Sequence, residues 1–261
     1  MHSQIEKLIL VSPKKSGTHL LKVFLENLNF TYKGKLNICS HKKGFYSLGY
    51  TFHTSYNKFF YLLDRDSFDG GKLLPLNDCL GIVSCRHPLD ILFSHLNFSY
   101  KNNNTAYSNI PKLSMEELIR IFFENQIYED FFKSLYEYTF WSYMNNFITL
   151  SYEHLIDIYL NQKRVSYSLK KFSELVKIKK INEAIFKSYG KSDTFHKGIV
   201  GKGLEYIKKN NKGILENKYY RKYCDFYGYD SEKVSKPKKL DEINKKKILF
   251  FDTRKKNQAY T

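Results

Sequence analysis

Cysteine, proline and glycine are scarce in this sequence. The chain of 261 residues has four cysteines, five prolines and 13 glycines, and this low proline and glycine content excludes a fibrous or low-complexity protein. The cysteines include no C-x-x-C pair and form no Cys/His cluster with the spacing of a zinc site. We therefore expect a reduced, intracellular protein that binds no metal.

Long hydrophobic runs are also missing. No stretch approaches the roughly 20 apolar residues that a membrane-spanning helix requires. The apolar run from Leu8 to Val11 is too short for the core of a signal peptide, and it leads directly into a polar loop. These observations predict a cytoplasmic protein without a membrane span.

Positive charge and aromatic side chains, by contrast, are abundant. Lys and Arg number 43 against 26 Asp and Glu, so the net charge is +17, and 17% of the residues are aromatic. Such a surplus implies anionic partners, which include nucleic acid, a phosphorylated cofactor, an acidic glycan and a membrane surface. Because the lysines are spread along the whole chain, the charge alone does not choose among these partners.

Short apolar runs alternate with stretches of helical periodicity. Residues 7–11, 79–85 and 148–151 are typical of buried strands, and residues 20–28 repeat Leu and Phe at helical spacing. This alternation predicts an α/β fold, a single domain over residues 1–261 with a central parallel sheet flanked by helices. Ligands of such folds bind at the carboxyl ends of the strands.

Two further regions complete the fold prediction. Residues 114–143 are mostly helical in pattern and begin with Ser114 as an N-cap, followed by acidic residues in the first turn. The Lys-rich tail 233–261 carries one apolar patch at 248–251. Its pattern fits a last helix or strand as well as partial disorder.

A loop with the sequence SPKKSGTH, residues 12–19, separates the first predicted strand from the first helix. Gly17 allows a close backbone approach, so the N–H groups of Ser16, Thr18 and His19 can bind an anion at the helix N-terminus. Lys15 adds a mobile positive charge. The Walker A spacing G-x-x-x-x-G-K-[ST] is absent, which disfavours a P-loop kinase or NTPase. Taken alone, the loop fits an ordinary strand-to-helix turn equally well.

A second motif follows the predicted strand at 79–85. Arg86 offers a planar, permanently charged fork that suits a phosphate group. Pro88 is favourable in a first helical turn, and Asp90 complements the helix dipole there. Ser94 lies two turns further along and can reach the phosphate that Arg86 holds. A surface salt bridge at Arg86 is the alternative interpretation.

Together the two motifs resemble those of the sulfotransferases that depend on PAPS, 3′-phosphoadenosine 5′-phosphosulfate. Residues 15–21, KSGTHLL, are similar to the family's 5′-phosphosulfate loop, although Lys14 stands where the family has proline. Arg86 and Ser94 fit the pattern R-x-P-x-D-x-x-x-S, whose Arg and Ser bind the 3′-phosphate. The resemblance implies a sulfotransferase fold related to that of P-loop kinases, and sulfuryl transfer from PAPS without a metal.

Two weaker similarities suggest further contacts with the same nucleotide. Residues 195–201, FHKGIVG, resemble the family's R-K-G-x-x-G loop, so His196, Lys197 and Gly198 are expected at the 3′-phosphate, with His196 in place of Arg. Gly203 stands where the family usually has Trp. Tyr152 resembles the family's tyrosine that contacts adenine. A Gly-rich surface loop and a core tyrosine are the respective alternatives.

Sulfuryl transfer needs a group that stabilises the leaving phosphate and a base that takes the acceptor's proton. By resemblance, Lys15 has the first role and His53 the second. A structural or surface role for His53 is nearly as well supported, and His41 is the rival base. Three other histidines are interpreted as lining residues of the nucleotide site: His19, His87 and His95.

The acceptor is expected to be a small molecule with a hydroxyl or amine group, bound by aromatic residues within 45–60 and 101–143. A glycan is a further class. Two other functions stay open: a basic nucleic-acid-binding protein, which lacks any recognised module, and a nucleotide kinase, which the missing Walker A motif opposes. We expect no nucleic-acid partner, and a homodimer is one option for the assembly.

Overall fold

The computed structural model describes residues 7–35, 44–48, 80–102, 113–161, 165–176, 181–189, 200–210 and 212–247. The strands are β1 (Lys7–Val11), β2 (Tyr32–Lys35), β3 (Gly44–Leu48), β4 (Leu80–Cys85) and β5 (Phe147–Ser151). The α-helices are α1 (Thr18–Asn27), α3 (Pro88–Asn102), α4 (Met115–Glu124), α5 (Ile127–Glu137), α6 (Tyr152–Asn161), α7 (Tyr167–Leu175), α8 (Ile181–Ser188), α9 (Lys202–Asn210) and α10 (Lys218–Tyr227). Short 3-10 helices are η2 (Tyr138–Tyr143) and η3 (Lys212–Glu216), and residues 240–247 are also helical.

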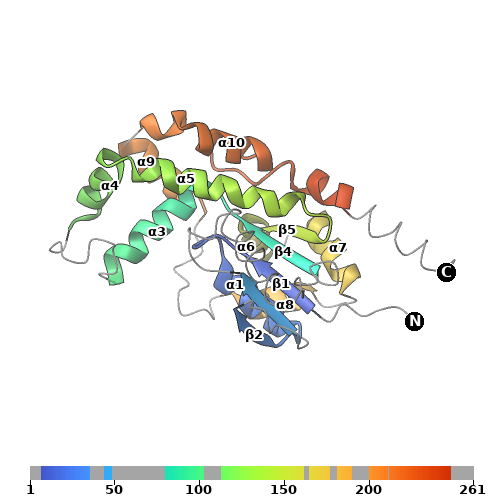
Figure 1. Ribbon diagram of the computed structural model, residues 1–261. Coiled ribbons are helices and arrows are strands. Elements are labelled where there is room, and N and C mark those ends of the chain that lie inside the picture. The colour runs from blue at the N-terminus through green and yellow to red at the C-terminus, as the bar shows by residue number, and fades with distance from the viewer. Residues whose placement is uncertain are drawn as a thin grey trace, which may run out of the picture.

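Within these residues the strands form one fully parallel sheet in the order β2-β3-β1-β4-β5. The predicted α/β fold, a single domain with a parallel sheet between helices, is confirmed (Figure 1). The bounds of β1, β4 and β5 agree within one residue with the apolar runs predicted as strands. From β1 the chain goes to one edge of the sheet and later crosses to β4 on the other side. Such a reversal of strand order is where α/β folds bind their ligands.

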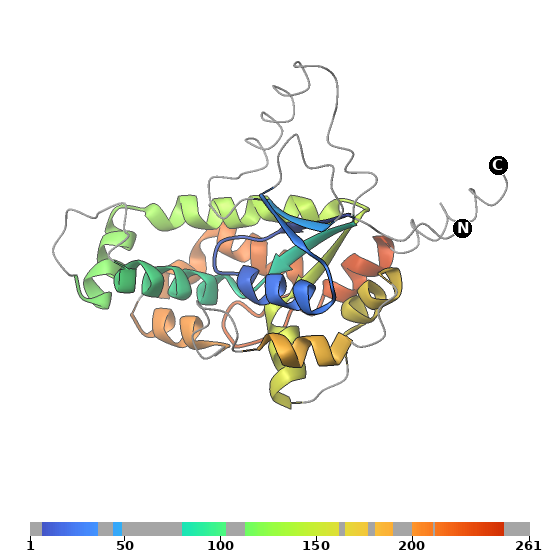
Figure 2. The same cartoon turned by 90° about the horizontal axis from the view of Figure 1, so that it is seen from below.

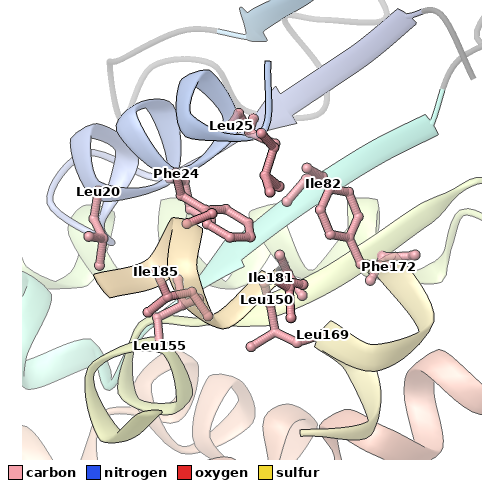
Figure 3. Close-up of a cluster of buried hydrophobic side chains, with 14 of the residues drawn as sticks. Leu20, Phe24, Leu25, Ile82, Leu150, Leu155, Leu169, Phe172, Ile181 and Ile185 are labelled. Atoms are coloured by element: carbon pink, nitrogen blue, oxygen red, sulfur yellow. The ribbon is translucent and has the colours of Figure 1, made fainter. Parts of the chain in front are cut away.

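Helices cover both faces of the sheet, which explains why β1 is apolar from Leu8 to Val11. Leu8 and Leu10 pack into a cluster with residues of α1, α6, α7 and α8, whereas Ile9 and Val11 pack with Trp141 of η2 on the other face. Figure 3 shows the first cluster, in which α1, α7 and α8 bring their apolar side chains onto β4 and β5. The centre of the sheet, where β1 and β4 pair, is therefore buried on both faces.

A second helical layer begins at the carboxyl end of β4. Helix α3 runs away from the sheet, with α4 and α9 packed against it (Figure 2), and α5 packs on α10. The predicted N-cap at Ser114 is confirmed: its Oγ accepts a hydrogen bond from Glu117 N–H at 3.2 Å, and the Glu117 carboxylate accepts one from Ser114 N–H at 2.7 Å. This reciprocal pair satisfies two backbone donors at the start of α4.

The described part of the Lys-rich tail packs against β5, a strand at the edge of the sheet. Asn244 forms a two-way pair with the backbone of Thr149: its Oδ1 accepts from Thr149 N–H at 3.0 Å, and its Nδ2 donates to Thr149 O at 2.8 Å. The side chain of Lys236 pairs with Asp157 of α6. Asn244 thus pairs with backbone groups that an edge strand would otherwise leave open.

None of the helices in the described part of the chain is long and apolar enough to cross a membrane.

Candidate functional site

The carboxyl ends of β1, β4 and β5 are adjacent in the sheet, and each is followed directly by a residue or loop that the sequence motifs single out (Figure 1). The loop of residues 12–17 follows β1, Arg86 follows β4, and Tyr152 follows β5 as the first residue of α6. Because the strands are parallel, these three features lie together at the carboxyl ends of the strands. The structure therefore brings together the two phosphate motifs that lie about 70 residues apart in the sequence, in agreement with the rule for ligand sites in such folds.

The loop after β1 is a tight turn held by its own hydroxyl groups. Ser12 Oγ lies 2.9 Å from Ser16 Oγ and 2.6 Å from Thr18 Oγ1, and Ser16 Oγ donates to Pro13 O at 2.7 Å. Ser84 Oγ of β4 donates to Ser16 O at 2.7 Å and ties the loop to the neighbouring strand. The Ser16 N–H also donates inside the loop, to Pro13 O at 3.1 Å. Because the hydroxyls of Ser16 and Thr18 and the Ser16 N–H are used in this way, the backbone N–H groups after Ser16 are the donors best suited to an anion.

Two residues of this loop adopt left-handed backbone conformations. Lys15 has φ 71° and Gly17 has φ 105°. A left-handed conformation is unfavourable for lysine, so the surrounding hydrogen bonds must hold it there. His19, in the first turn of α1, has an exposed side chain, and its backbone N–H lies in the orphan region of the helix N-terminus.

The ammonium of Lys15 lies on the face of an aromatic ring from α3. Its Nζ is 3.4 Å from the centroid of the Phe98 ring, whereas Lys14 Nζ is 5.4 Å away. Burial, together with the positive charges of Lys14 and Arg86, lowers the pKa of Lys15 to about 8. An approaching phosphate would raise the pKa of Lys15, because an anion favours the protonated form.

Arg86 bridges the loop and Tyr152. Its Nη1 donates to Lys15 O at 3.2 Å, and its Cζ lies 4.2 Å from the centroid of the Tyr152 ring. The Nε atom of Arg86 is buried and has no hydrogen-bond partner among the described residues. A guanidinium so placed keeps unused donor capacity at the site, as expected of a group that receives an anion.

Ser94 and Asp90 lie on α3 at four-residue intervals before Phe98, so all three share one side of the helix. This is the side on which Phe98 meets Lys15. Ser94 is half-buried there. That Ser94 contacts the phosphate bound by Arg86 stays a prediction, and the position of Ser94 on this side of α3 is consistent with it.

No protein-family model matches the sequence, and no curated protein matches it. Among solved structures, the crystal structure of mouse sulfotransferase SULT7A1 complexed with PAP is similar, with a TM-score of 0.55 and 18% sequence identity over 88% of this chain and 90% of that one. This chain has the sulfotransferase fold. At this identity the likeness concerns the fold alone.

Within this sulfotransferase fold, Asp90 makes a contact that its sequence position does not reveal. Its buried carboxylate accepts hydrogen bonds from the backbone N–H groups of Gly201 and Gly203, both at 2.7 Å. A Cβ atom on Gly203 would come within 2.1 Å of Leu89 O, so this position admits only glycine. The packing of α9 against the start of α3 thus explains why Gly203 occurs where the sulfotransferase motif usually has Trp.

The interpretation of His87 as a lining residue is wrong. Its side chain is buried beneath the Arg86 turn, with ring contacts to Tyr220 and Tyr229 and Nε2 3.3 Å from Asp230 O. Burial lowers the pKa of His87, so the ring is a neutral core group. His95 is half-buried against Phe131, and its interpretation as a lining residue stays a prediction. Burial, together with the positive charges of Lys14 and Lys15, lowers the pKa of His95 to about 4.

The remaining predicted residues lie outside the described part of the chain: His41, His53, His196, Lys197 and Gly198. Among the described residues, no group of three or more His, Cys, Asp or Glu side chains could hold a metal ion. The cysteines Cys85 and Cys224 are buried and free.

Proposed function

We propose that this protein is a sulfotransferase that moves a sulfuryl group from PAPS to a hydroxyl or amine of a small acceptor. The observation that carries the proposal is the convergence of Lys15 and Arg86 at neighbouring strand ends, joined by the hydrogen bond from Arg86 Nη1 to Lys15 O. PAPS carries anionic groups at both its 5′ and 3′ positions. A site with two separate cations, each from its own motif, matches that charge pattern better than a site for one phosphate chain.

Each described residue has a role consistent with its surroundings. Lys15 and the backbone N–H groups of its loop would stabilise the leaving phosphate, where negative charge develops during transfer. Arg86, with Ser94, would bind the 3′-phosphate. The ring of Tyr152 is buried between Gly17 and Arg86 and so fixes the spacing of these two groups, whereas its contact with adenine rests on the sequence resemblance alone.

The other roles rest on the sequence resemblance. His53 would accept the proton of the acceptor, and His196, Lys197 and Gly198 would complete the 3′-phosphate site. We further propose a cytoplasmic enzyme whose acceptor is a small molecule, with a glycan as a second class to be screened. These assignments need no metal.

The test is thermal stabilisation by three ligands: adenosine 3′,5′-bisphosphate, ATP and single-stranded DNA. We expect a rise in melting temperature with the bisphosphate, because a ligand that binds only the folded protein stabilises it by mass action. Stabilisation by DNA alone would refute the proposal in favour of a nucleic-acid-binding protein, and stabilisation by ATP alone would favour a kinase. An acceptor screen with sulfur-labelled PAPS then tests transfer itself.

Two variants and one control sharpen this test. Lys15→Ala and Arg86→Ala should abolish transfer, the second through loss of donor binding. Arg120→Ala removes the same charge as Arg86→Ala from an exposed position on α4, where Arg120 pairs with Glu124, and should leave transfer unchanged. Full activity of Arg86→Ala would contradict its assignment.

A further inference from the structure

The peptide bond between Arg86 and His87 is held from both sides. Its oxygen, Arg86 O, accepts a hydrogen bond from Tyr223 Oη at 3.2 Å, and its N–H, on His87, donates to Glu153 Oε1 at 2.7 Å. The oxygen and the N–H of a trans peptide point in opposite directions. Two partners on opposite sides therefore restrain rotation of the peptide plane from which the Arg86 side chain departs.

Both carboxylate oxygens of Glu153 accept hydrogen bonds, and only one of them binds this peptide. Glu153 is only 2% exposed, and its second oxygen, Oε2, accepts a hydrogen bond from Tyr229 Oη at 2.9 Å. Burial raises the pKa of Glu153, although the His87 N–H and nearby Arg86 oppose the shift. A buried carboxylate is costly, and an apolar side chain of similar volume is often no less stable. Its presence here calls for a role other than stability.

Glu153 directly follows Tyr152, and the two act on different parts of the same arginine. The Tyr152 ring contacts the guanidinium of Arg86, whereas the Glu153 carboxylate binds the backbone next to it. Tyr223 of α10 and Tyr229 beyond that helix stack with parallel rings, 6.4 Å apart between centroids. Residues from α6 and from the C-terminal part of the chain thus meet at the base of Arg86.

We propose that Glu153 is a positioning residue, which acts together with Tyr223 and Tyr229. These residues hold the Arg86 guanidinium in the orientation that binds the 3′-phosphate, and so give the site its preference for 3′-phosphorylated nucleotides. This proposal rests on the proposed function. A small rotation of the Arg86–His87 peptide is magnified along the long arginine side chain. Misplacement of a binding group by about 1 Å can cost about 100-fold in the step that it serves.

The experiment compares two nucleotides that differ only in the 3′-phosphate. Affinities for adenosine 3′,5′-bisphosphate and adenosine 5′-monophosphate are measured by calorimetry on the full chain. We expect Glu153→Ala to weaken binding of the bisphosphate about tenfold or more, the effect of losing one charge-assisted hydrogen bond, and to change binding of the monophosphate less than about twofold. Glu153→Gln keeps an oxygen for the His87 N–H and should restore most of the preference.

A cycle with Arg86→Ala separates positioning from general damage. Without the guanidinium, Glu153→Ala should have no further effect on bisphosphate affinity, because the two residues act through one another. If a folded Glu153→Ala weakens both nucleotides equally, or neither, the positioning role is wrong. If the wild-type protein itself shows no preference for the bisphosphate, the proposed function fails instead.

If Glu153→Ala does not fold, two less disruptive variants test the same proposal. Tyr223→Phe removes only the hydroxyl that binds Arg86 O. Tyr227→Phe is its matched control, because it removes a buried hydroxyl of the same helix that pairs with Ser142 Oγ at 2.9 Å. We expect the nucleotide preference to fall in Tyr223→Phe and to persist in Tyr227→Phe. Equal preference in both would overturn the proposal.

Discussion

The backbone of Gly17 lies directly against the ring of Tyr152. A Cβ atom on residue 17 would come within 2.7 Å of Tyr152 Cδ2, closer than real Cβ atoms approach. The same ring also contacts the guanidinium of Arg86, whose Cζ lies 4.2 Å from the ring centroid. One aromatic side chain from the end of β5 therefore fixes the distance between the loop after β1 and the arginine after β4.

Gly17→Ala should destabilise the protein for two reasons. The left-handed φ of 105° costs alanine about 1 kcal/mol, and the clash with Tyr152 adds about 1–3 kcal/mol. We expect the free energy of unfolding, measured by denaturant titration, to fall by about 2–4 kcal/mol. In a Tyr152→Ala background only the cost of φ should remain. An equal loss in both backgrounds would contradict the contact.

Much of this fold could be predicted from the sequence because its signals are local. Strands buried on both faces must be continuous apolar runs, so residues 7–11 stand out without any alignment. The capping box at Ser114 and Glu117 depends on two residues only three apart. The phosphate loop and the Arg86 turn were recognisable for the same reason.

The rest of the site depends on contacts between distant segments. The sequence position of Asp90 predicts an interaction with the helix dipole, yet its carboxylate binds the backbone of Gly201, 111 residues away. The sequence position of Glu153 likewise predicts an acidic residue in the first turn of α6, but its carboxylate accepts a hydrogen bond from the His87 backbone. The sequence does not predict the burial of His87, because its place inside the motif says nothing about the tyrosines that bury it. The pairing of β4 with β5 brings Glu153 next to His87, and the packing of α9 on α3 brings Gly201 to Asp90.

Binding of the nucleotide should weaken at alkaline pH through Lys15. The pKa of Lys15 is lowered to about 8, so the ammonium loses its proton above that pH and its attraction for phosphate with it. We expect the dissociation constant for adenosine 3′,5′-bisphosphate to rise about tenfold per pH unit above 8. Lys15→Arg stays charged and should lack this rise. Lys14→Ala removes a neighbouring charge that lowers the pKa, so its rise should begin at a higher pH. Identical profiles for wild type and Lys15→Arg would refute the assignment.

Asp90→Ala should destabilise the junction between α3 and α9. The substitution leaves the N–H groups of Gly201 and Gly203 without their acceptors, and each buried unpaired group costs about 1–3 kcal/mol. We expect a loss of about 2–4 kcal/mol in the free energy of unfolding. Asp90→Asn retains one acceptor oxygen and should lose about half as much. Glu205→Ala, an exposed first-turn acid of α9, is the control and should change little. Wild-type stability of Asp90→Ala would show that the bridge does not matter.

The titration of Lys247 should make the free energy of unfolding increase with pH. Its side chain is 3% exposed, and its Nζ has no hydrogen-bond partner among the described residues. Burial lowers its pKa from 10.5 to about 7. Between these two values the unfolded chain binds more protons at this residue than the folded protein does, so stability must increase with pH across this window.

Replacing Lys247 with methionine removes the group that titrates and keeps the apolar volume. We expect Lys247→Met to be more stable than wild type at pH 7 by on the order of 1–3 kcal/mol, with the difference shrinking toward zero near pH 10. Lys246→Met takes the same charge from an exposed neighbouring position and should show no such trend. Denaturant unfolding at pH 6, 7, 8, 9 and 10 measures all three proteins. Parallel stability curves for wild type and Lys247→Met would mean that the buried amine keeps its proton in the folded state, held by an anionic partner.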